Sequence, residues 1–378
     1  MHFSNPLLVS ALACAGSVAA AGVVGEAFGF AAGTTGGGDA EPVYPTSIDE
    51  LTGYLTDSEP RVIILDQEFN YIGSEGTTTE DGCRPDSNTC PDNGGQDAIN
   101  GANWCDGQTA VSVTYDTAGV TSIDVGSNKS IVGSGTSAVI RGKGLRITGG
   151  SNVIVQNIHI TELNPQYIWG GDALTLVDTD LVWIDHVKTS LIGRQHIVAG
   201  YDASNRVTIS NSEIDGSTSW SASCDEHHYW AILLLGEADK VTFQGNYIHH
   251  TSGRSPKVGG TTLLHAVNNF WYDNTGHAFD ISENANVIAE GNVMQSVKTP
   301  LNEGAELLFS APDDSANAAC QDPLGYVCEV NVLTDCDSDF SSAAVTSFLS
   351  SFEGEGVTAT SASDVANSVK ANAGVGKL

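Results

Sequence analysis

The stretch "NVIVQNIHI" at residues 152–160 alternates apolar, mostly β-branched residues with polar ones and ends where the chain must turn. The pattern recurs five times at intervals of 22 to 34 residues, as "LVWIDHVKT" from 181, "RVTISNSEI" from 206, "KVTFQGNYI" from 240, "TLLHAVNNF" from 262 and "NVIAEGNVM" from 286. Short alternating segments of this composition are typical of β-strands. Their recurrence predicts a parallel β-helix, because one coil cannot bury its inner face alone and stacked coils share a continuous core.

Asparagine recurs at the turns of these segments. Asn157 and Asn211 occupy the sixth position of their segments, and Asn246, Asn268 and Asn292 the seventh. Stacked side-chain amides can hydrogen bond from one coil to the next. We therefore interpret these asparagines as structural rather than catalytic.

The remainder of the 378-residue chain shows no linker, so we expect an all-β protein with a single domain over residues 21–378. The segment 46–55 predicts a short helix that begins with a capping box of Ser47 and Glu50. Residues 71–109 hold three cysteines among many turn formers, which predicts a long loop pinned by disulfides. The Ser- and Ala-rich C-terminal segment is expected to pack on the β-helix, with a helix around residues 340–354.

The N-terminus predicts export. Residues 1–20 contain a short apolar run that ends in small residues, as in a signal peptide. Cleavage there removes Cys14 and leaves seven cysteines without a C-x-x-C pair, which favours disulfides over metal ligation and leaves one thiol unpaired. The sequon Asn128-Lys129-Ser130 predicts a glycosylation site. No later stretch has the ~20 apolar residues that a membrane span needs, so we expect a secreted, extracellular monomer.

The charge of the chain restricts its partners. Asp and Glu number 46 against 15 Lys and Arg, for a formal net charge of −31. Nucleic acid, an anionic membrane and polyanionic ligands are disfavoured by repulsion. A polymeric substrate is therefore expected to be close to neutral, although an acidic surface also serves solubility alone.

Motifs for several enzyme classes are missing. His227 and His228 are adjacent without a second cluster at zinc-ligand spacing, and neither a G-x-S-x-G elbow nor a Gly-rich phosphate loop is present. Acidic and basic residues near strand ends remain as candidates, because loops there are held by a rigid body. They fall in three stretches, "WGGDAL" at 169–174, "WIDHVKTSLIGRQHIV" at 183–198 and "SGRSPKVGG" at 252–260.

Together these stretches resemble the secreted fungal pectin lyases of the pectate lyase superfamily. The resemblance covers most of the mature chain through "TGGGDAEPVYPTSIDEL", "SNKSIVGSGT", "IRGKGLRI", "WGGDALTLVDTDLVWIDHV", "IGRQHIV", "HHYW", "SGRSPKV" and "LLHAVNNFW". It implies a right-handed parallel β-helix that cleaves methyl-esterified homogalacturonan (pectin) by β-elimination.

The resemblance also assigns residues to roles. Arg254 matches the arginine that takes the C5 proton, and Asp172 and Arg194 match the two groups that flank the reacting sugar. The aromatic residues of the family's cleft match Trp169, Tyr229 and Trp230.

Four other polar residues near these stretches require an interpretation. His196 follows Arg194 by two positions, so we expect it to orient Arg194 or to contact the sugar. Lys257 either binds substrate or balances the charge of Asp172. Asp185 and His186 lie within a strand repeat and are interpreted as structural.

The resemblance further implies three disulfides. These join Cys83 with Cys105, Cys90 with Cys224, and Cys320 with Cys328. Cys336 departs from the family pattern and is left as the unpaired thiol.

No cofactor is expected, and calcium in particular is not required. A methyl ester makes the C5 hydrogen more acidic than a carboxylate does, because the enolate charge is not added to an existing one. Pectate lyases, which act on the free acid, supply help with carboxylate-bound calcium near the position of Asp172. Here Arg194 offers a fixed cation instead, and Gly259 stands where pectate lyases carry a second arginine.

Three alternatives share this fold class. A calcium-dependent pectate lyase acting on demethylated polygalacturonate is disfavoured by Arg194, by Gly259 and by the net charge. A polygalacturonase-type glycosidase needs paired carboxylates and its own Gly-His-Gly and Arg-Ile-Lys stretches, which are missing. A non-catalytic pectin-binding β-solenoid is not excluded by the fold.

Overall fold

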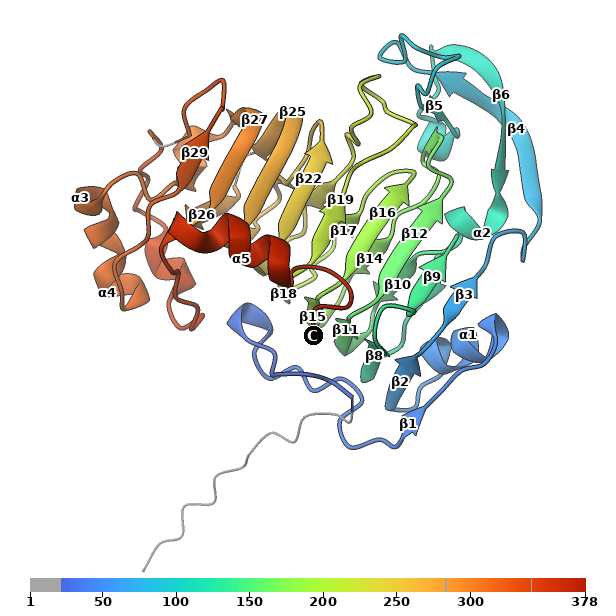
Figure 1. Cartoon of the computed structure of the whole chain (residues 1–378), viewed down its shortest axis with the longest axis horizontal. Coiled ribbons are helices and arrows are strands. Elements are labelled where there is room, and N and C mark those ends of the chain that lie inside the picture. Colours follow the sequence, from blue (N-terminus) through green and yellow to red (C-terminus); the bar gives the residue numbers. More distant parts are fainter. Residues whose placement is uncertain (1–21, 283, 341) are drawn as a thin grey trace, which may run out of the picture.

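A computed structural model describes residues 22–282, 284–340 and 342–378, and its strands wind into a right-handed parallel β-helix (Figure 1). The predicted signal peptide lies outside the described residues. One long face of the coil is a ten-stranded parallel sheet, in the order β1 (Pro42–Val43), β2 (Arg61–Leu65), β8 (Lys129–Gly133), β11 (Ser151–Gln156), β15 (Asp180–Asp185), β18 (Arg206–Ser210), β21 (Lys240–Gln244), β24 (Leu263–Val267), β26 (Asn286–Glu290) and β28 (Leu308–Phe309).

The other faces belong to a fifteen-stranded sheet with two arms that meet at the long strand β25 (Phe270–Ile281). One arm contains β3 (Glu68–Asn70), β9 (Val139–Arg141), β12 (His159–Leu163), β16 (Lys188–Ile192), β19 (Glu213–Asp215) and β22 (Tyr247–Thr251), and continues past β25 into β27 (Val293–Glu303) and β29 (Val332–Thr334). The other arm contains β7 (Ile123–Asp124), β10 (Leu145–Thr148), β14 (Leu174–Val177), β17 (Ile197–Ala199), β20 (Ile232–Leu234) and β23 (Lys257–Val258).

The predicted repeats are confirmed as successive strands of the ten-stranded sheet. Their registers place one inward-facing aliphatic residue above the next, in the column Val153, Val182, Val207, Val241, Leu264 and Val287. Each of these side chains is completely buried in the main core. The alternation in the sequence therefore reflects a core that runs the length of the coil.

An asparagine ladder runs along one turn, although its membership differs from the prediction. The Nδ2 of Asn246 donates to Oδ1 of Asn269, and Asn269 donates in the same way to Asn292, which donates to Asn331. Asn268 is not a member, because its backbone is left-handed and its amide binds Gly291 and Thr360 instead. Asn157 and Asn211 also lie outside the ladder, bound to Gly133 and Asp185.

Replacing Asn269 with alanine is expected to lower the free energy of unfolding by about 3 kcal/mol. Asn269 is completely buried, and its loss removes the acceptor of the Asn246 backbone N–H, one of the two acceptors of the Asn246 side-chain amide and the side-chain donor to the Phe243 carbonyl. Denaturant unfolding measures the change, with the exposed Asn372→Ala as the control. Equal stability of the two variants would contradict a structural role for the ladder.

The predicted N-terminal helix is confirmed as α1 (Ile48–Thr56), whose N-cap Ser47 accepts a hydrogen bond from the backbone of Glu50. The prediction that residues 71–109 form a loop is wrong in part. That segment contains β4 (Thr77–Arg84) and β5 (Asp97–Ala98), which join β6 (Thr109–Asp116) and β13 (Tyr167–Ile168) in a four-stranded sheet. The three consecutive threonines that open β4 pair with β6, and this short β-prone run is hidden among the neighbouring turn formers.

The predicted helix at 340–354 is also wrong. Among the described residues of that segment only the 3₁₀ turn η5 (Leu349–Phe352) forms, because Phe348, Leu349 and Phe352 reach the core from an irregular backbone. A helix forms later instead, α5 (Val365–Asn372), and packs on Phe270 and Val293. Short helical turns occupy the remaining connections, namely α2 (Thr117–Val120), α3 (Asp314–Asn317), α4 (Gln321–Leu324), η1 (Gly29–Ala31), η2 (Gly101–Asn103), η3 (Ala305–Leu307), η4 (Ala318–Cys320) and η6 (Ala362–Asp364). Among these helices none combines the length and apolar character of a membrane crossing.

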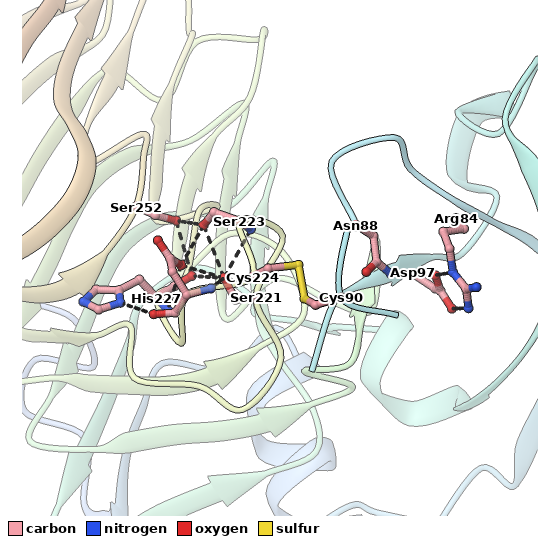
Figure 2. The surroundings of a disulfide bond; sticks show 10 residues. Arg84, Asn88, Cys90, Asp97, Ser221, Ser223, Cys224, His227 and Ser252 are labelled. Carbon is pink, nitrogen blue, oxygen red and sulfur yellow. Dashed lines mark hydrogen bonds and ion pairs between the residues drawn. A yellow bond between two sulfur atoms is a disulfide. The ribbon is translucent and has the colours of Figure 1, made fainter. Parts of the chain in front are cut away.

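The three implied disulfides form in the structure. Cys83 bonds to Cys105, Cys90 to Cys224 and Cys320 to Cys328, while Cys336 is a free thiol. The Cys90–Cys224 bond ties the segment before β5 to the loop after β19, across 134 residues of sequence (Figure 2). The sequon residue Asn128 is half-buried and accepts a hydrogen bond from Asn152.

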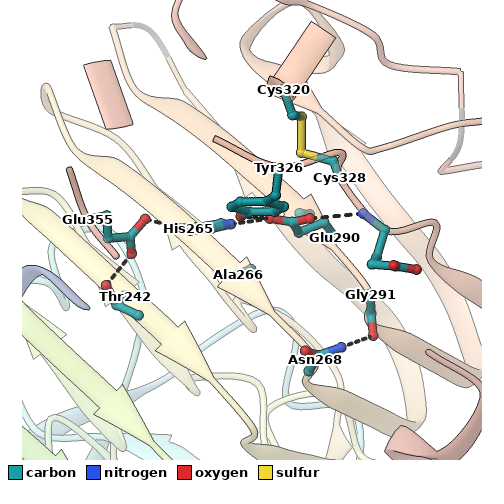
Figure 3. Close-up of polar contacts among 12 residues, drawn as sticks. Thr242, His265, Ala266, Asn268, Glu290, Gly291, Cys320, Tyr326, Cys328 and Glu355 are labelled. Atoms are coloured by element: carbon teal, nitrogen blue, oxygen red, sulfur yellow. Dashed lines mark hydrogen bonds and ion pairs between the residues drawn. A yellow bond between two sulfur atoms is a disulfide. The ribbon is translucent and has the colours of Figure 1, made fainter. Parts of the chain in front are cut away.

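A buried ionic cluster ties the C-terminal segment to the coil (Figure 3). His265 on β24 contacts Glu290 on β26 at 2.7 Å and Glu355 at 2.6 Å. The side chains of His265, Glu290 and Glu355 are 1%, 0% and 3% exposed. Tyr326 donates a further hydrogen bond to Glu290.

Candidate active site

A cavity of about 500 Å³ opens on the outer face of the neighbouring strands β14, β17, β20 and β23. Its floor is the sheet, and the segments that precede these strands, together with Tyr201 after β17, supply most of its walls. Six of the predicted site residues line it together: Trp169, Asp172, Arg194, Trp230, Arg254 and Lys257. Side chains separated by up to 88 residues of sequence are thus collected at one place, because equivalent loops stack from coil to coil.

Asp172 and Arg194 form a two-pronged ion pair in this cleft. Nε of Arg194 donates to Oδ1 of Asp172 at 2.8 Å, and Nη2 donates to Oδ2. The backbone N–H of Gln195 donates to the same carboxylate at 2.8 Å. The guanidinium also stacks on Trp169, with its carbon 3.9 Å from the ring centre. The pair is therefore rigid, and its charges neutralise each other.

Arg254 is held differently, through its backbone. Its φ of 45° is left-handed, and its N–H donates to Nε2 of His277 at 3.3 Å. The guanidinium carbon lies 4.7 Å from the ring centre of Trp230 and 5.8 Å from that of Tyr229. Within the described ranges no carboxylate forms a salt bridge with Arg254. Its positive charge is therefore available to a ligand in the cleft.

Gly253 allows this arrangement of Arg254. A Cβ at position 253 would lie 2.5 Å from the ring of Tyr229, so a larger residue would displace the tyrosine. Tyr229 itself supports the wall from behind, in an apolar cluster with Ala98 and Ile168.

The loop before Arg254 is fixed by a hydrogen-bonded network (Figure 2). The hydroxyl of Ser223, next to the disulfide residue Cys224, is hydrogen-bonded to the hydroxyl of Ser252 at 2.6 Å. Ser221 and Ser223 both donate to Asp225 at 2.9 Å. The Cys90–Cys224 bond therefore anchors the segment that carries Arg254.

Lys257 does not balance Asp172, so that alternative is wrong. Its ammonium contacts Asp280 at 2.9 Å and Glu303 at 3.9 Å. Lys257 and Asp280 are paired across β23 and β25, whereas Asp172 is already paired with Arg194. A substrate contact by Lys257 remains a prediction.

His196 is not placed to contact a sugar. It is completely buried, and its Nδ1 is bonded to Thr189 at 2.8 Å inside the coil. Burial, together with the neighbouring His228, lowers the pKa of His196 well below 6.5. The two-residue alternation that we assumed between Arg194 and His196 fails, because both residues precede β17 and neither lies in a strand. The prediction that His196 binds substrate is therefore wrong, because its side chain is buried.

Asp185 and His186 are structural, as interpreted. Asp185 is buried and accepts hydrogen bonds from Gln156, Ser210 and Asn211. Its other partner is Nδ1 of His186 at 2.7 Å. The cluster lies on the ten-stranded sheet, away from the cleft floor.

Three residues at the site were not predicted from the sequence. Trp104 and Tyr201 line the cleft, and His277 holds the backbone of Arg254. Trp104 precedes Cys105, whose disulfide was a usable signal that this aromatic side chain is held in place. Tyr201 and His277 carry no such signal in the sequence.

One family model, described as pectate lyase, matches residues 97–378. The chain belongs to the pectate lyase family. Among curated members, pectin lyase B of Emericella nidulans is 55% identical over the full length of both chains. Probable pectin lyase A of Aspergillus fumigatus is 53% identical, also over both full lengths. Probable pectin lyase F of Aspergillus niger is 55% identical over 98% of this chain and 79% of its own.

Solved structures of the pectate lyase family share the fold. A pectate lyase from Acidovorax avenae subsp. citrulli aligns with a TM-score of 0.58 at 16% identity, over 98% of this chain and 99% of its own. A pectate lyase from Bacillus sp. N165, solved with trigalacturonate, aligns with a TM-score of 0.59 at 18% identity, over 92% and 98%. Both relatives confirm the predicted β-helix.

Pectate lyase family membership raises the question of a calcium site. In this cleft both oxygens of Asp172 accept from Arg194, so the carboxylate does not fit a calcium ion. The described residues contain one group with metal-ligand spacing, Glu213, Asp215 and His249. The ammonium of Lys188 already binds Glu213 and Asp215 at 2.8 and 3.0 Å, so both carboxylates of that group have a cationic partner.

Proposed function

We propose that this protein is a pectin lyase that cleaves methyl-esterified homogalacturonan by β-elimination. The observation that carries the proposal is the unpaired Arg254 guanidinium beside the closed Asp172–Arg194 pair in one aromatic-walled cleft. The full-length identity to pectin lyases supports the substrate class.

The chemistry follows from the substrate. The C5 hydrogen of an esterified galacturonate is α to the C6 carbonyl, and the glycosidic oxygen at C4 is β to it. Removal of the C5 proton gives an enolate, which expels the C4 oxygen and leaves a 4,5-unsaturated sugar. The bond breaks without water.

We assign Arg254 to the C5–C6 unit of the reacting sugar. A guanidinium normally keeps its proton, so Arg254 can act as the base only in its neutral form. Neighbouring cations favour that neutral form. Arg194 and Lys257 are each bound to a carboxylate, which weakens that effect, and stacking on Trp230 favours the charged form. In the charged form Arg254 stabilises the enolate, an interaction worth a few kcal/mol.

Aromatic side chains suit the apolar faces of sugar rings. Trp169 and Trp230 face the cleft, and we propose them as platforms for the sugars that flank the cut, with Tyr229 behind them. Asp172 and Arg194 would present a net-neutral surface to the ester.

Calcium independence is part of the proposal. Besides Arg194, Gly259 supports it, because a Cβ there would lie 2.8 Å from Leu235 and 2.5 Å from Ser282. A second arginine, which would hold a free carboxylate, therefore lacks room unless these side chains move.

A chelator is expected to leave the rate on highly esterified pectin unchanged within a factor of about two. The measurement follows the ultraviolet absorbance of the unsaturated product, on esterified pectin and on demethylated polygalacturonate, each with and without chelator. Loss of the rate with chelator, or reaction of the demethylated polymer alone, would support the calcium-dependent alternative. Binding of pectin without any unsaturated product would support a non-catalytic solenoid.

The location is also proposed. We infer that residues 1–20 direct export and that the mature protein acts outside the cell on plant-derived pectin. Secretion of the full-length chain, followed by N-terminal sequencing of the product, tests this.

A further inference from the structure

One row of side chains crosses the floor of the cleft in single file. The strand registers align one outward-facing residue from each of eight strands, in the order Asp124, Arg146, Thr175, Val198, Leu233, Lys257, Asp280 and Glu303. Thr175, Val198, Leu233 and Lys257 of this row line the cavity. The row therefore continues the cleft floor at both ends.

The charges of this row lie only at its ends. Thr175, Val198 and Leu233 are uncharged, and so are Val177, Gly200 and Leu235, which line the cavity in the adjacent row. At one end Arg146 is 45% exposed and only loosely paired with Asp124, at 3.8 Å. At the other end stand Lys257, Asp280 and Glu303.

The far end has an excess of negative charge. Lys257 is bound most closely by Asp280, at 2.9 Å, whereas Glu303 is 3.9 Å away and 56% exposed. Both carboxyl groups lie against the same ammonium, and Asp280 raises the pKa of Glu303 through a hydrogen bond and its charge. One ammonium therefore faces two carboxyl groups there.

A polymer in this cleft meets the row strand by strand. The cavity extends across β14, β17, β20 and β23, so a bound chain lies across the strands. Parallel strands are about 4.8 Å apart, which is close to the length of one sugar unit, so successive sugars lie over successive strands. Methyl esters over the uncharged middle contact apolar side chains, whereas a free carboxylate over Glu303 meets like charge.

We propose that this row makes cleavage depend on where the methyl esters lie along the substrate. It requires esters over the uncharged middle, disfavours a free carboxylate over Glu303 and accepts a free carboxylate over Arg146. This inference rests on the proposed function. The resulting specificity is for partly esterified galacturonan whose free acids lie on one side of the cut only.

The test compares two pectins of the same origin, one highly esterified and one partly demethylated. The measured quantity is kcat/KM on the partly demethylated pectin divided by kcat/KM on the highly esterified pectin. Glu303→Gln is expected to raise this ratio about two- to fivefold, because one repulsive charge is removed. Arg146→Gln is expected to lower it by a similar factor. Glu353→Gln is the matched control, since Glu353 is exposed beside η5 and η5 packs on the ten-stranded sheet.

Two results would overturn the inference. The first is that the kcat/KM ratio of Glu303→Gln equals the ratio of the Glu353→Gln control or is lower than it. The second comes from mass spectrometry of the products of partly esterified oligomers, if free acids occur equally on both sides of the cut. In either case activity on highly esterified pectin would still support the proposed function, whereas no unsaturated product from any pectin would reject that function itself.

Discussion

Replacing Arg254 with lysine is expected to lower kcat on highly esterified pectin by at least about 100-fold. The guanidinium of Arg254 stacks on Trp230 and presents several fixed donors to the cleft, and an ammonium on a flexible stem cannot reproduce that geometry. The backbone position is unaffected, because it depends on the hydrogen bond from N–H of residue 254 to His277. The release of unsaturated product from esterified pectin measures the effect.

Arg206→Lys is the matched control for this variant. Arg206 is 48% exposed, pairs with Asp180 and lies on the ten-stranded sheet, so its replacement should leave kcat within a factor of about two. A folded Arg254→Lys protein with most of its activity would show that Arg254 is not essential.

The pH profile of the Arg254→Lys variant separates the two roles of this residue. An ammonium loses its proton at lower pH than a guanidinium, so residual activity that rises steeply with alkaline pH indicates a base at position 254. A flat profile indicates that the residue acts by its charge.

Replacing His265 with glutamine is expected to lower the free energy of unfolding by about 3 to 5 kcal/mol at pH 6. The change leaves Glu290 and Glu355 buried without a cation between them. It also removes one tie of the C-terminal segment, since Glu355 bonds both to His265 on β24 and to Thr242 (Figure 3).

The same cluster predicts an alkaline loss of stability in the unaltered protein. Burial alone lowers the pKa of His265, but the carboxylates of Glu355 and Glu290 outweigh it and raise the pKa to about 10. In the unfolded chain the pKa is near 6.5, so the stabilisation is fully present below about pH 6.5 and is lost as the pH rises toward 10.

Denaturant unfolding at pH 6, 8 and 9.5 tests both statements. The difference in the free energy of unfolding between the unaltered protein and His265→Gln should shrink as the pH rises. His159→Gln is the control, because burial lowers the pKa of His159 to about 4 and places its titration below this range. A difference that stays constant from pH 6 to 9.5 would show that His265 is not charged in the folded protein.

The fold was predictable from the sequence to the level of single strands. Segments such as 181–189 and 240–248 carry a two-residue alternation, and the structure contains β15 and β21 there. Errors arose where a pattern was weak. The threonine-rich strand β4 was hidden among turn formers, and a helix was predicted around residues 340–354 although Phe348 and Phe352 are buried without one.

The sequence predicted which residues belong to the site better than it predicted their contacts. Trp169, Asp172, Arg194, Trp230, Arg254 and Lys257 do line one cleft. The partner of Lys257 and the burial of His196 were not predictable, because a shift of one residue at the start of a strand decides which way a side chain points.

By itself, the sequence determined the β-helix, its repeats and the residues of the cleft, because alternation and turn chemistry are local properties of the chain. The tertiary structure alone decided which charges meet. Arg194 closes on Asp172 across 22 residues, His265 bridges to Glu355 across 90, and the floor row ends in Glu303 because strand registers align it with Lys257. The physical reason is that an ion pair depends on distances of a few ångströms, which the stacking of coils sets and which no local pattern records.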